Sequence, residues 1–208
     1  EYIDGVPVNQ YAATRKLDIN ARVGLMMQLC GALQFAHQQL VVHADIKPSN
    51  VLVTTDGSVK LLDFGIAQLM GSDGSQPSTI SGGRREPMTA AYAAPERTAG
   101  GAPTVACDVY SLGVVLRELL HEDAQPLQPS HPLLAVAAKA TAYNPADRYG
   151  SVAALTADLS RWSRRMPVGA MRPTLGYRAR LFFARNRAAV SIGAITLCGL
   201  LAATGISI

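Results

Sequence analysis

The sequence predicts an α+β fold that is mainly helical, with one small β-hairpin and a single transmembrane helix at its C-terminal end. Three observations support this: long segments with helical spacing of apolar residues, two short apolar runs around a turn, and a final stretch without charge. Of the 208 residues, 49% are hydrophobic and 16% are charged, which excludes a disordered chain. The length allows one domain of about 150 residues and a smaller part.

Helical periodicity is found in three segments. Residues 22–39, 105–120 and 132–164 place apolar side chains at intervals of three and four, so we expect helices there. Between the first two helices, residues 71–87 are rich in Gly, Ser and Pro, which predicts a long loop.

A hairpin is expected from two short apolar runs, residues 51–53 and 59–62, on either side of an Asp-Gly turn. If the hairpin is centred on that dipeptide, Leu52 faces Leu61 and Asn50 faces Asp63. Directly opposed residues have Cα atoms about 4.5–5.5 Å apart. We therefore expect the Asn50 carboxamide and the Asp63 carboxylate to lie side by side.

The residues around this hairpin point to phosphoryl transfer. Carboxamide and carboxylate oxygens suit Mg²⁺, which takes a few protein oxygens together with phosphate oxygens. The preceding segment, His43-Ala44-Asp45-Ile46-Lys47-Pro48-Ser49-Asn50, adds a second carboxylate, Asp45, and a cation, Lys47. One acid to orient a hydroxyl, one cation for developing phosphate charge and two metal ligands are the groups that this reaction requires.

Charge is distributed unevenly along the chain. Residues 1–158 hold all 15 acidic residues and 11 Lys and Arg, whereas residues 159–208 hold eight Arg and no acidic residue. The overall net charge of +4 therefore does not indicate nucleic-acid binding. The eight arginines are interleaved with Trp162, Tyr177, Phe182 and Phe183. Such a segment could bind nucleic acid or be a solvated linker, but its place before an apolar stretch favours contact with anionic lipid.

The apolar stretch is residues 188–208, which contain no charged side chain. As a helix these residues would span roughly 31 Å, which matches a hydrocarbon core of about 30 Å. A buried core helix is the alternative, and a signal peptide is excluded because the stretch lies at the C-terminal end. We expect a transmembrane helix at the end of a fragment of a longer protein. The three cysteines form no C-x-x-C pair, which favours reduced thiols over a zinc or disulfide framework.

Five motifs in order resemble the protein kinase family over about 160 residues. The segment 43–50 resembles the catalytic loop H-R-D-x-K-x-x-N, and Asp63-Phe64-Gly65 resembles the DFG motif. Residues 89–96, which read TAAYAAPE, are similar to the T-x-x-Y-x-A-P-E that closes the activation segment. Residues 108–113 resemble the central helix of the C-lobe, and residues 145–148 resemble its late P-x-x-R element.

The resemblance implies a protein kinase-like fold, of which this chain would hold the C-lobe, and a role for each matching residue. Asp45 would accept the proton of the substrate hydroxyl, Lys47 would stabilise the transferred phosphoryl group, and Asn50 and Asp63 would bind Mg²⁺. Around the nucleotide, Leu52 would lie under the adenine ring, and the opening residues, with Glu1 and Ile3, would form the hinge. Other residues would give structural support. Thr89 would brace Asp45 and Lys47, Asp108 would hold the catalytic-loop backbone, and Glu96 would pair with Arg148. The remaining supporting residues are His43, Phe64 and Gly65.

Departures from the family pattern are also present. No G-x-G-x-x-G-x-V loop, V-A-I-K lysine or early helix with a partner glutamate is found, so we expect only the hinge and C-lobe here and no catalysis by this chain alone. Ala44 replaces the Arg of H-R-D, which in many kinases pairs with a phosphorylated activation loop. His37, His121 and His131 show no metal-ligand spacing and are predicted to be non-functional.

The whole arrangement resembles bacterial receptor-type Ser/Thr kinases. It implies a kinase hinge and C-lobe at residues 1–163, a basic juxtamembrane linker at 164–187 and a transmembrane helix at 188–208. The chain would be a single-pass protein of the bacterial plasma membrane with its kinase part in the cytoplasm. Its implied partners are ATP, Mg²⁺, protein Ser and Thr hydroxyls and the membrane; a homodimer is left open, and nucleic acid is not expected.

Two alternative functions remain at this point. A small-molecule phosphotransferase of the aminoglycoside or choline type shares an H-x-D-x-x-x-x-N loop, but Lys47, Thr89 and the Ala94-Pro95-Glu96 sequence favour a protein kinase. A pseudokinase or truncated scaffold that signals by binding is kept open by Ala44 and by the missing N-lobe motifs.

Overall fold

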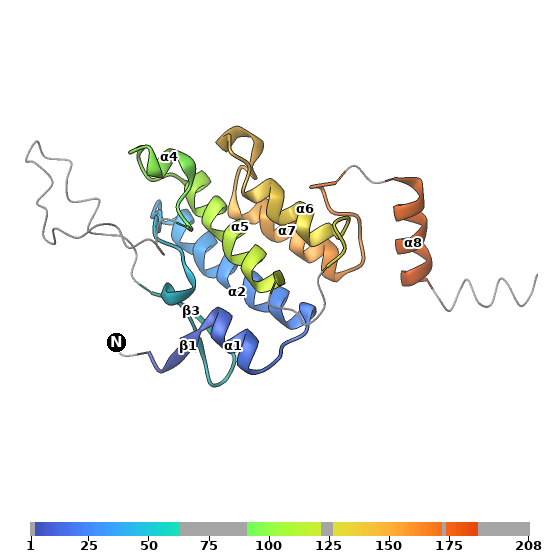
Figure 1. Ribbon diagram of the computed structural model, residues 1–208, viewed down its shortest axis with the longest axis horizontal. Helices are drawn as coiled ribbons and strands as arrows, with labels where there is room; N and C mark the ends of the chain where they lie inside the picture. Colours follow the sequence, from blue (N-terminus) through green and yellow to red (C-terminus); the bar gives the residue numbers. More distant parts are fainter. Residues whose placement is uncertain (1–2, 63–90, 122–126, 172–173, 187–208) are drawn as a thin grey trace, which may run out of the picture.

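The computed structural model describes residues 3–62, 91–121, 127–171 and 174–186 (Figure 1). Four helices lie side by side and form the body of the molecule: α2 (Ile19–Gln38), α5 (Val105–His121), α6 (Pro132–Ala140) and α7 (Val152–Ser163). A small sheet and α1 (Val8–Thr14) cover one end of this body, and α4 (Pro95–Thr98) lies near the other end. The last described helix, α8 (Leu175–Arg185), stands beside the body.

The core lies between the long helices. Leu29 and Leu33 of α2, Leu112 of α5 and Leu155 and Leu159 of α7 are at most 1% exposed. Their burial follows the three- and four-residue spacing that predicts these helices, because such spacing places apolar side chains on one face. The helices predicted at residues 22–39 and 105–120 are therefore found, α2 starting three residues earlier and α5 ending one residue later.

Side-chain caps define where these helices begin. The Asp18 carboxylate accepts the Ala21 N–H at 2.8 Å at the start of α2, and the Ser151 hydroxyl accepts the Ala154 N–H at 3.2 Å at the start of α7. Such caps satisfy N–H groups that have no partner within the helix.

The single helix predicted over residues 132–164 is wrong, because α6 and α7 are separate elements. Between them the chain forms a turn of 3₁₀-helix at Pro145–Asp147, with the Asn144 side chain accepting the Ala146 N–H at 3.2 Å. Proline lacks a donor and restricts the residue before it, so a helix cannot run through this point.

The sheet contains three antiparallel strands in the order β1 (Gly5–Pro7), β2 (Val51–Thr54) and β3 (Val59–Leu61). The hairpin of β2 and β3 was expected, whereas the strand β1 was not. Three residues are too few for a periodic pattern, so β1 becomes a strand only through its pairing with β2, where Val6 lies opposite Val53.

The register predicted for the hairpin is wrong by one residue. Val51 pairs with Leu61 and Leu52 with Lys60, rather than Leu52 with Leu61. The loop has three residues instead of two: the Gly57 N–H donates to Thr54 O at 2.9 Å, and Gly57 takes a φ of +83°. A type I turn followed by a left-handed glycine is the usual three-residue hairpin loop, and its extra residue shifts the pairing. Asn50 consequently lies next to Leu62, whose N–H donates to Asn50 O at 2.8 Å, and not opposite Asp63.

Residues 161–187, which hold the eight arginines, do not form one continuous helix, and the prolines at positions 167 and 173 explain this. Helix α7 ends at Ser163 and α8 begins at Leu175, where the Thr174 hydroxyl caps the Tyr177 N–H at 3.3 Å. Among the helices that the structure describes, none is both long and apolar enough to cross a membrane. The span predicted at residues 188–208 lies outside the described residues.

Candidate active site

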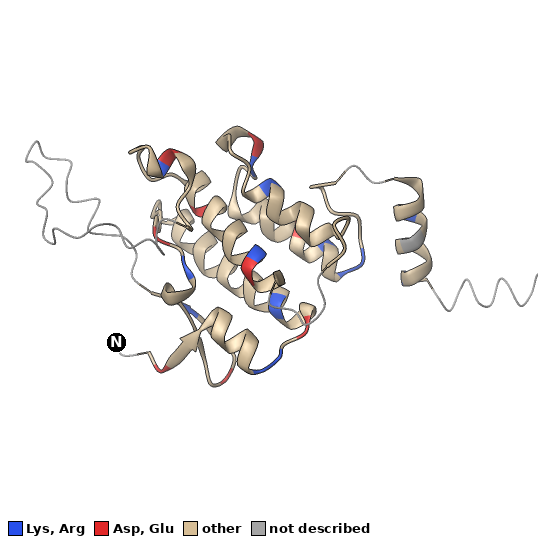
Figure 2. Cartoon of the chain, viewed as in Figure 1, with Lys and Arg blue, Asp and Glu red and all other residues tan. Residues whose placement is uncertain are grey.

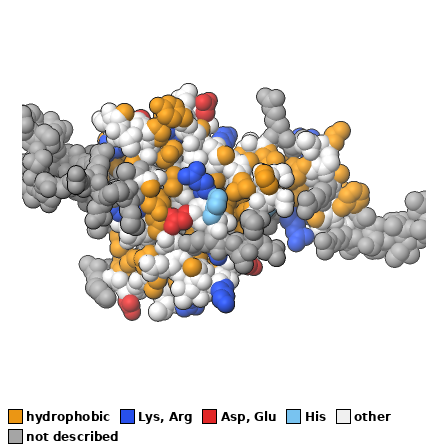
Figure 3. Space-filling model, viewed as in Figure 1, with side chains coloured by type: hydrophobic (Ala, Val, Ile, Leu, Met, Phe, Trp, Pro, Cys, Tyr) orange, Lys and Arg blue, Asp and Glu red, His pale blue; other side chains and the backbone are white. Residues whose placement is uncertain are grey.

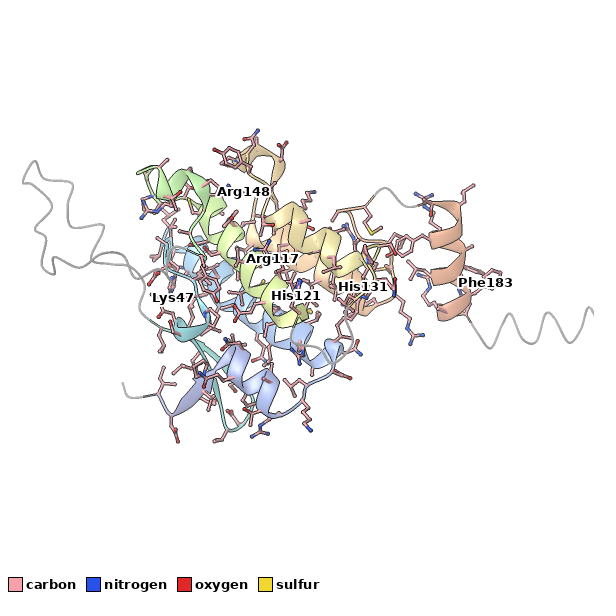
Figure 4. The ribbon with its side chains drawn as sticks, in the orientation of Figure 1. Lys47, Arg117, His121, His131, Arg148 and Phe183 are labelled. Carbon is pink, nitrogen blue, oxygen red and sulfur yellow. The ribbon has the colours of Figure 1, made fainter. Side chains whose placement is uncertain are left out.

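The predicted catalytic loop, His43–Asn50, connects the end of α2 to β2 and lies where the helical body meets the sheet. Its last three residues form a turn of 3₁₀-helix, Pro48–Asn50, in which the Asn50 N–H donates to Lys47 O at 2.9 Å. Lys47, labelled in Figure 4, marks this junction. The loop has little regular structure, so its shape depends on contacts with the helices on either side.

Asp108 of α5 provides the main contact that holds the loop. Its carboxylate is fully buried and accepts the His43 N–H at 2.9 Å and the Ala44 N–H at 2.8 Å. Ala44 takes a φ of +65°, in the left-handed region that side chains disfavour. Two successive N–H groups directed at one anion stabilise this conformation, as in the backbone nests that bind anions elsewhere.

His37 of α2 is a third partner of the same carboxylate. Its Nε2 lies 2.8 Å from Asp108 Oδ2, and its side chain is 11% exposed. His37 was predicted to be non-functional because it shows no metal-ligand spacing in the sequence. The structure instead gives it a structural position behind the catalytic loop. Its contact is not visible in the sequence because 71 positions separate the two residues.

His43 links the loop to the strand that leads into Asp63. The Asp45 N–H donates to His43 Nδ1 at 3.3 Å, so Nδ1 has no proton and Nε2 carries it. Nε2 then donates to Leu62 O at 2.7 Å. The ring is fully buried, and it ties the backbone of Asp45 to the residue directly before Asp63.

Asp45, Lys47 and Asn50 form one cluster. Lys47 Nζ lies 2.9 Å from Asp45 Oδ2, and the Asn50 amide nitrogen donates to Asp45 O at 2.8 Å and to Asp45 Oδ2 at 3.0 Å. The Asp45 side chain is 38% exposed and the Lys47 side chain 22%, so both are accessible to a substrate. The structure therefore brings a carboxylate, an ammonium group and a carboxamide together at the surface.

The orientation of Asn50 determines which of its atoms could bind a metal. Both of its partners on Asp45 are acceptors, so the NH₂ group must face Asp45 and the Oδ1 atom points elsewhere. A carboxamide oxygen is a suitable ligand for Mg²⁺. Across the described ranges, no three His, Cys, Asp or Glu side chains gather closely enough to hold a metal ion. The predicted second ligand, Asp63, lies outside those ranges.

Other predicted site residues are also outside the described part of the chain: Glu1, Phe64, Gly65 and Thr89. Of the residues expected around a nucleotide, Ile3 and Leu52 are both partly exposed. Leu52 lies in β2 between the buried residues Val51 and Val53, so its side chain is on the face of the sheet away from the core. This is the face on which an apolar contact to a bound base is possible.

Glu96 and Arg148 form a bidentate ion pair, with N–O distances of 2.6 and 2.8 Å. The Arg148 side chain is fully buried and that of Glu96 is 26% exposed. All five Arg148 donors are used, since the remaining three bonds go to the carbonyl oxygens of Ala142, Ala106 and Tyr143 at 2.7, 3.0 and 3.0 Å. The pair joins α4 to the turn between α6 and α7.

The hydrogen bonds from Arg148 lower the pKa of Glu96 to about 2, from an ordinary 4.5. A carboxylate in a bidentate contact with a guanidinium is stabilised in its charged form, and this effect outweighs burial, which acts in the opposite direction. Glu96 is therefore ionised at all physiological pH values.

Glu118 of α5 is a further residue of the site that no sequence motif predicts. It accepts the Asn9 amide of α1 at 2.8 Å and the Tyr92 hydroxyl at 2.5 Å. Tyr92 belongs to the predicted activation-segment motif, so Glu118 connects that segment to the helical body. A glutamate in a periodic helix carries no signal for such a contact, and only the fold reveals it.

The chain is similar to known protein kinases. A family model for the protein kinase domain matches residues 1–146. The serine/threonine-protein kinase PknB of Mycobacterium tuberculosis is 33% identical over 189 residues, which cover 77% of this chain and 29% of PknB. Pkn1 of Myxococcus xanthus is 36% identical over 185 residues, which cover 74% and 26%. PrkC of Bacillus subtilis is 37% identical over 121 residues, which cover 58% and 18%. The chain thus spans less than a third of the length of these curated relatives.

Proposed function

This chain belongs to the protein kinase family, and on that premise we propose that it forms the hinge and C-lobe of a bacterial protein Ser/Thr kinase. Such an enzyme transfers the γ-phosphoryl group of ATP to Ser or Thr hydroxyls of protein substrates. The observation that carries the proposal is the cluster of Asp45, Lys47 and Asn50, held from behind by Asp108.

Each member of the cluster has a chemical task in this proposal. The exposed Asp45 carboxylate orients the substrate hydroxyl and accepts its proton. The Lys47 ammonium, 2.9 Å from Asp45, supplies positive charge where negative charge develops on the transferred group. Both act through position, because phosphoryl transfer depends mainly on alignment and charge stabilisation.

The family generally uses ATP with Mg²⁺, and the donor set of this chain suits that ion. The amide nitrogen of Asn50 faces Asp45, so its amide oxygen points away from that residue. Asp63 directly follows Leu62, whose carbonyl oxygen accepts a hydrogen bond from His43 Nε2 at 2.7 Å. We assign Asn50 and Asp63 as the residues that would hold Mg²⁺, which supplies positive charge to the phosphate oxygens when it is bound.

Membrane anchoring is a further part of the proposal. Residues 188–208 carry no charge and have the length of a bilayer span, and residues 159–187 before them hold the eight arginines. We propose that residues 188–208 cross the plasma membrane and that residues 1–187 lie in the cytoplasm. Reporter enzymes fused after Ile208, one active only outside the cytoplasm and one only inside it, test this. Activity of the cytoplasmic reporter alone would refute the span.

The catalytic part is tested with a chimera that joins the N-terminal lobe of PknB to residue 1 of this chain. With γ-labelled ATP and Mg²⁺ we expect label on Ser and Thr of a general protein substrate. Asp45→Asn should lower the rate by about 100-fold or more, the range for a lost general base. A chimera that binds Mg–ATP but transfers no phosphate would instead support a scaffold that acts by binding.

A further inference from the structure

Helix α8 has two distinct faces. Tyr177, Leu181 and Ala184 are partly buried and share one side of the helix. Leu175 is 85% exposed, and Phe182 and Phe183 are 53% and 54% exposed. These three side chains lie on one side of the helix, since their positions follow helical spacing. Figure 3 shows hydrophobic side chains along the outer edge of α8, and Figure 4 labels Phe183 there.

A hydrogen bond joins α8 to the body, and we call the exposed side with Leu175, Phe182 and Phe183 the outward face of the helix. Arg165, just after α7, donates from its guanidinium to Ala184 O at 3.1 Å in the last turn of α8. Arg165 itself is held in a left-handed conformation, with a φ of +54°, and its N–H donates to Trp162 O at 2.9 Å. The residue that touches α8 is thus tied to the end of α7.

A second attachment lies a few residues further along the chain. The buried carboxylate of Asp158 accepts the Gly169 N–H at 2.7 Å and the Ala170 N–H at 2.9 Å, and also the Tyr149 hydroxyl and Arg161. Burial alone would raise the pKa of Asp158, but these donors, the Gly169 N–H first, hold it below its ordinary value. The connection from α7 to α8 is therefore folded back on the body.

The surroundings of the outward face are basic. Arg178 and Arg185 are exposed and flank the apolar side chains, and Figure 2 shows blue but no red on α8. Asp158 is the last acidic residue of the chain, and its carboxylate is already bound by four donors. A hollow of about 450 Å³ beside the helix is lined by Arg165, Arg178 and Arg185 and by apolar side chains, among them Phe182 and Phe183.

We propose that α8 lies flat on an anionic bilayer, with Leu175, Phe182 and Phe183 in the boundary between headgroups and acyl chains and the arginines against lipid phosphates. An aromatic apolar face flanked by arginines is the pattern of helices that bind in this plane. Anionic lipids attract such arginines over about one Debye length. The inference rests on the membrane anchoring proposed above and adds to it a fixed position of the kinase part against the bilayer.

The test is the depth of a tryptophan placed on α8 in the full chain, reconstituted into lipid vesicles. In a Trp162→Phe background, Phe182→Trp puts the reporter on the outward face, and Tyr143→Trp puts it at an 83% exposed position of the body as a control. Vesicles contain lipids brominated in the acyl chains, with about 30% phosphatidylserine or with phosphatidylcholine alone. We expect bromine to quench Phe182→Trp about twofold in the anionic vesicles and to leave Tyr143→Trp unchanged.

Charge dependence is tested with Arg178→Gln combined with Arg185→Gln, and Arg117→Gln at an exposed position of α5 is the matched control. Only the double variant should lose the extra quenching that phosphatidylserine causes. If the chain is recovered with the vesicles on flotation but bromine does not quench Phe182→Trp, this inference is overturned, while the proposed membrane anchoring is still supported. If the chain is not recovered with the vesicles at all, both the membrane anchoring and the position of α8 on the bilayer are refuted. Equal quenching in both kinds of vesicle would refute the anionic surface as the partner.

Discussion

The side-chain carboxylate of Asp108 accepts the backbone N–H of Ala44 at 2.8 Å, across 64 positions of the chain. Ala44 takes a left-handed conformation at the start of the predicted catalytic loop, and Asp45 follows it directly. The backbone directly before Asp45, the predicted catalytic residue, is therefore held by a buried residue of α5.

We expect Asp108→Asn to destabilise the protein by about 2–4 kcal/mol, since an NH₂ group would replace an oxygen that accepts buried N–H donors. Asp147→Asn, which removes an exposed carboxylate in a 3₁₀ turn, should change the free energy of unfolding by less than about 0.5 kcal/mol. Urea denaturation of both variants measures the difference. Equal stability of the two variants would mean that Asp108 does not hold the loop.

The ion pair of Glu96 and Arg148 predicts a pH dependence of stability. The pKa of Glu96 is about 2 in the folded protein and 4.5 ordinarily, so its contribution is fully present above pH 4.5 and is lost as the pH falls towards 2. We expect Glu96→Gln to cost about 1.5–3 kcal/mol at neutral pH, because it leaves the buried Arg148 charge without its partner.

The measurement is urea denaturation of wild type and Glu96→Gln between pH 7 and pH 2. The difference in the free energy of unfolding between the two proteins should shrink between pH 4.5 and 2. In this range the unfolded wild type takes up a proton at Glu96 before the folded wild type does, whereas Glu96→Gln has no such proton to take up. A difference that stays constant over that range would contradict the assigned pKa.

Gly113 of α5 packs closely against the end of α6. A Cβ atom added there would lie 2.6 Å from Ala140 Cβ and 2.8 Å from Thr141 Cγ2. We therefore expect Gly113→Ala to destabilise the protein by about 1–3 kcal/mol through overpacking. Gly31→Ala in α2 is the matched control, because nothing lies within 4 Å of its added Cβ. It should stabilise the protein by about 0.5–1 kcal/mol through helix propensity. Thermal unfolding of both variants checks the opposite signs, and a stabilising Gly113→Ala would refute the close packing.

Much of this fold could be predicted because its long helices carry their signal locally. The spacing of Val23, Met26 and Cys30 is enough to place α2. The hairpin register could not be placed in the same way, since a single left-handed glycine, Gly57, decides between a two- and a three-residue loop. A one-residue shift of this kind changes every opposed pair, and it places Leu62 opposite Asn50.

In the candidate site, too, residues that are close together in the sequence could be predicted and contacts between distant residues could not. Asp45, Lys47 and Asn50 lie within six residues, so sequence motifs find them together. His37 and Glu118 act through partners that are 71 and 109 positions away, His37 on Asp108 and Glu118 on Asn9. Contacts at such separations are set by the packing of α1, α2 and α5, and no local pattern in a single sequence contains them.

The central claim is that Asp45 serves the transfer step and that Asp63 serves the metal–nucleotide complex. The most direct measurement is Mg–ATP affinity and phosphoryl transfer of the chimera with the PknB N-terminal lobe, for wild type, Asp45→Asn and Asp63→Asn. Both variants should lose transfer, but only Asp63→Asn should weaken Mg–ATP binding, by about tenfold or more. Unchanged Mg–ATP affinity in Asp63→Asn, or full transfer activity in Asp45→Asn, would contradict the account.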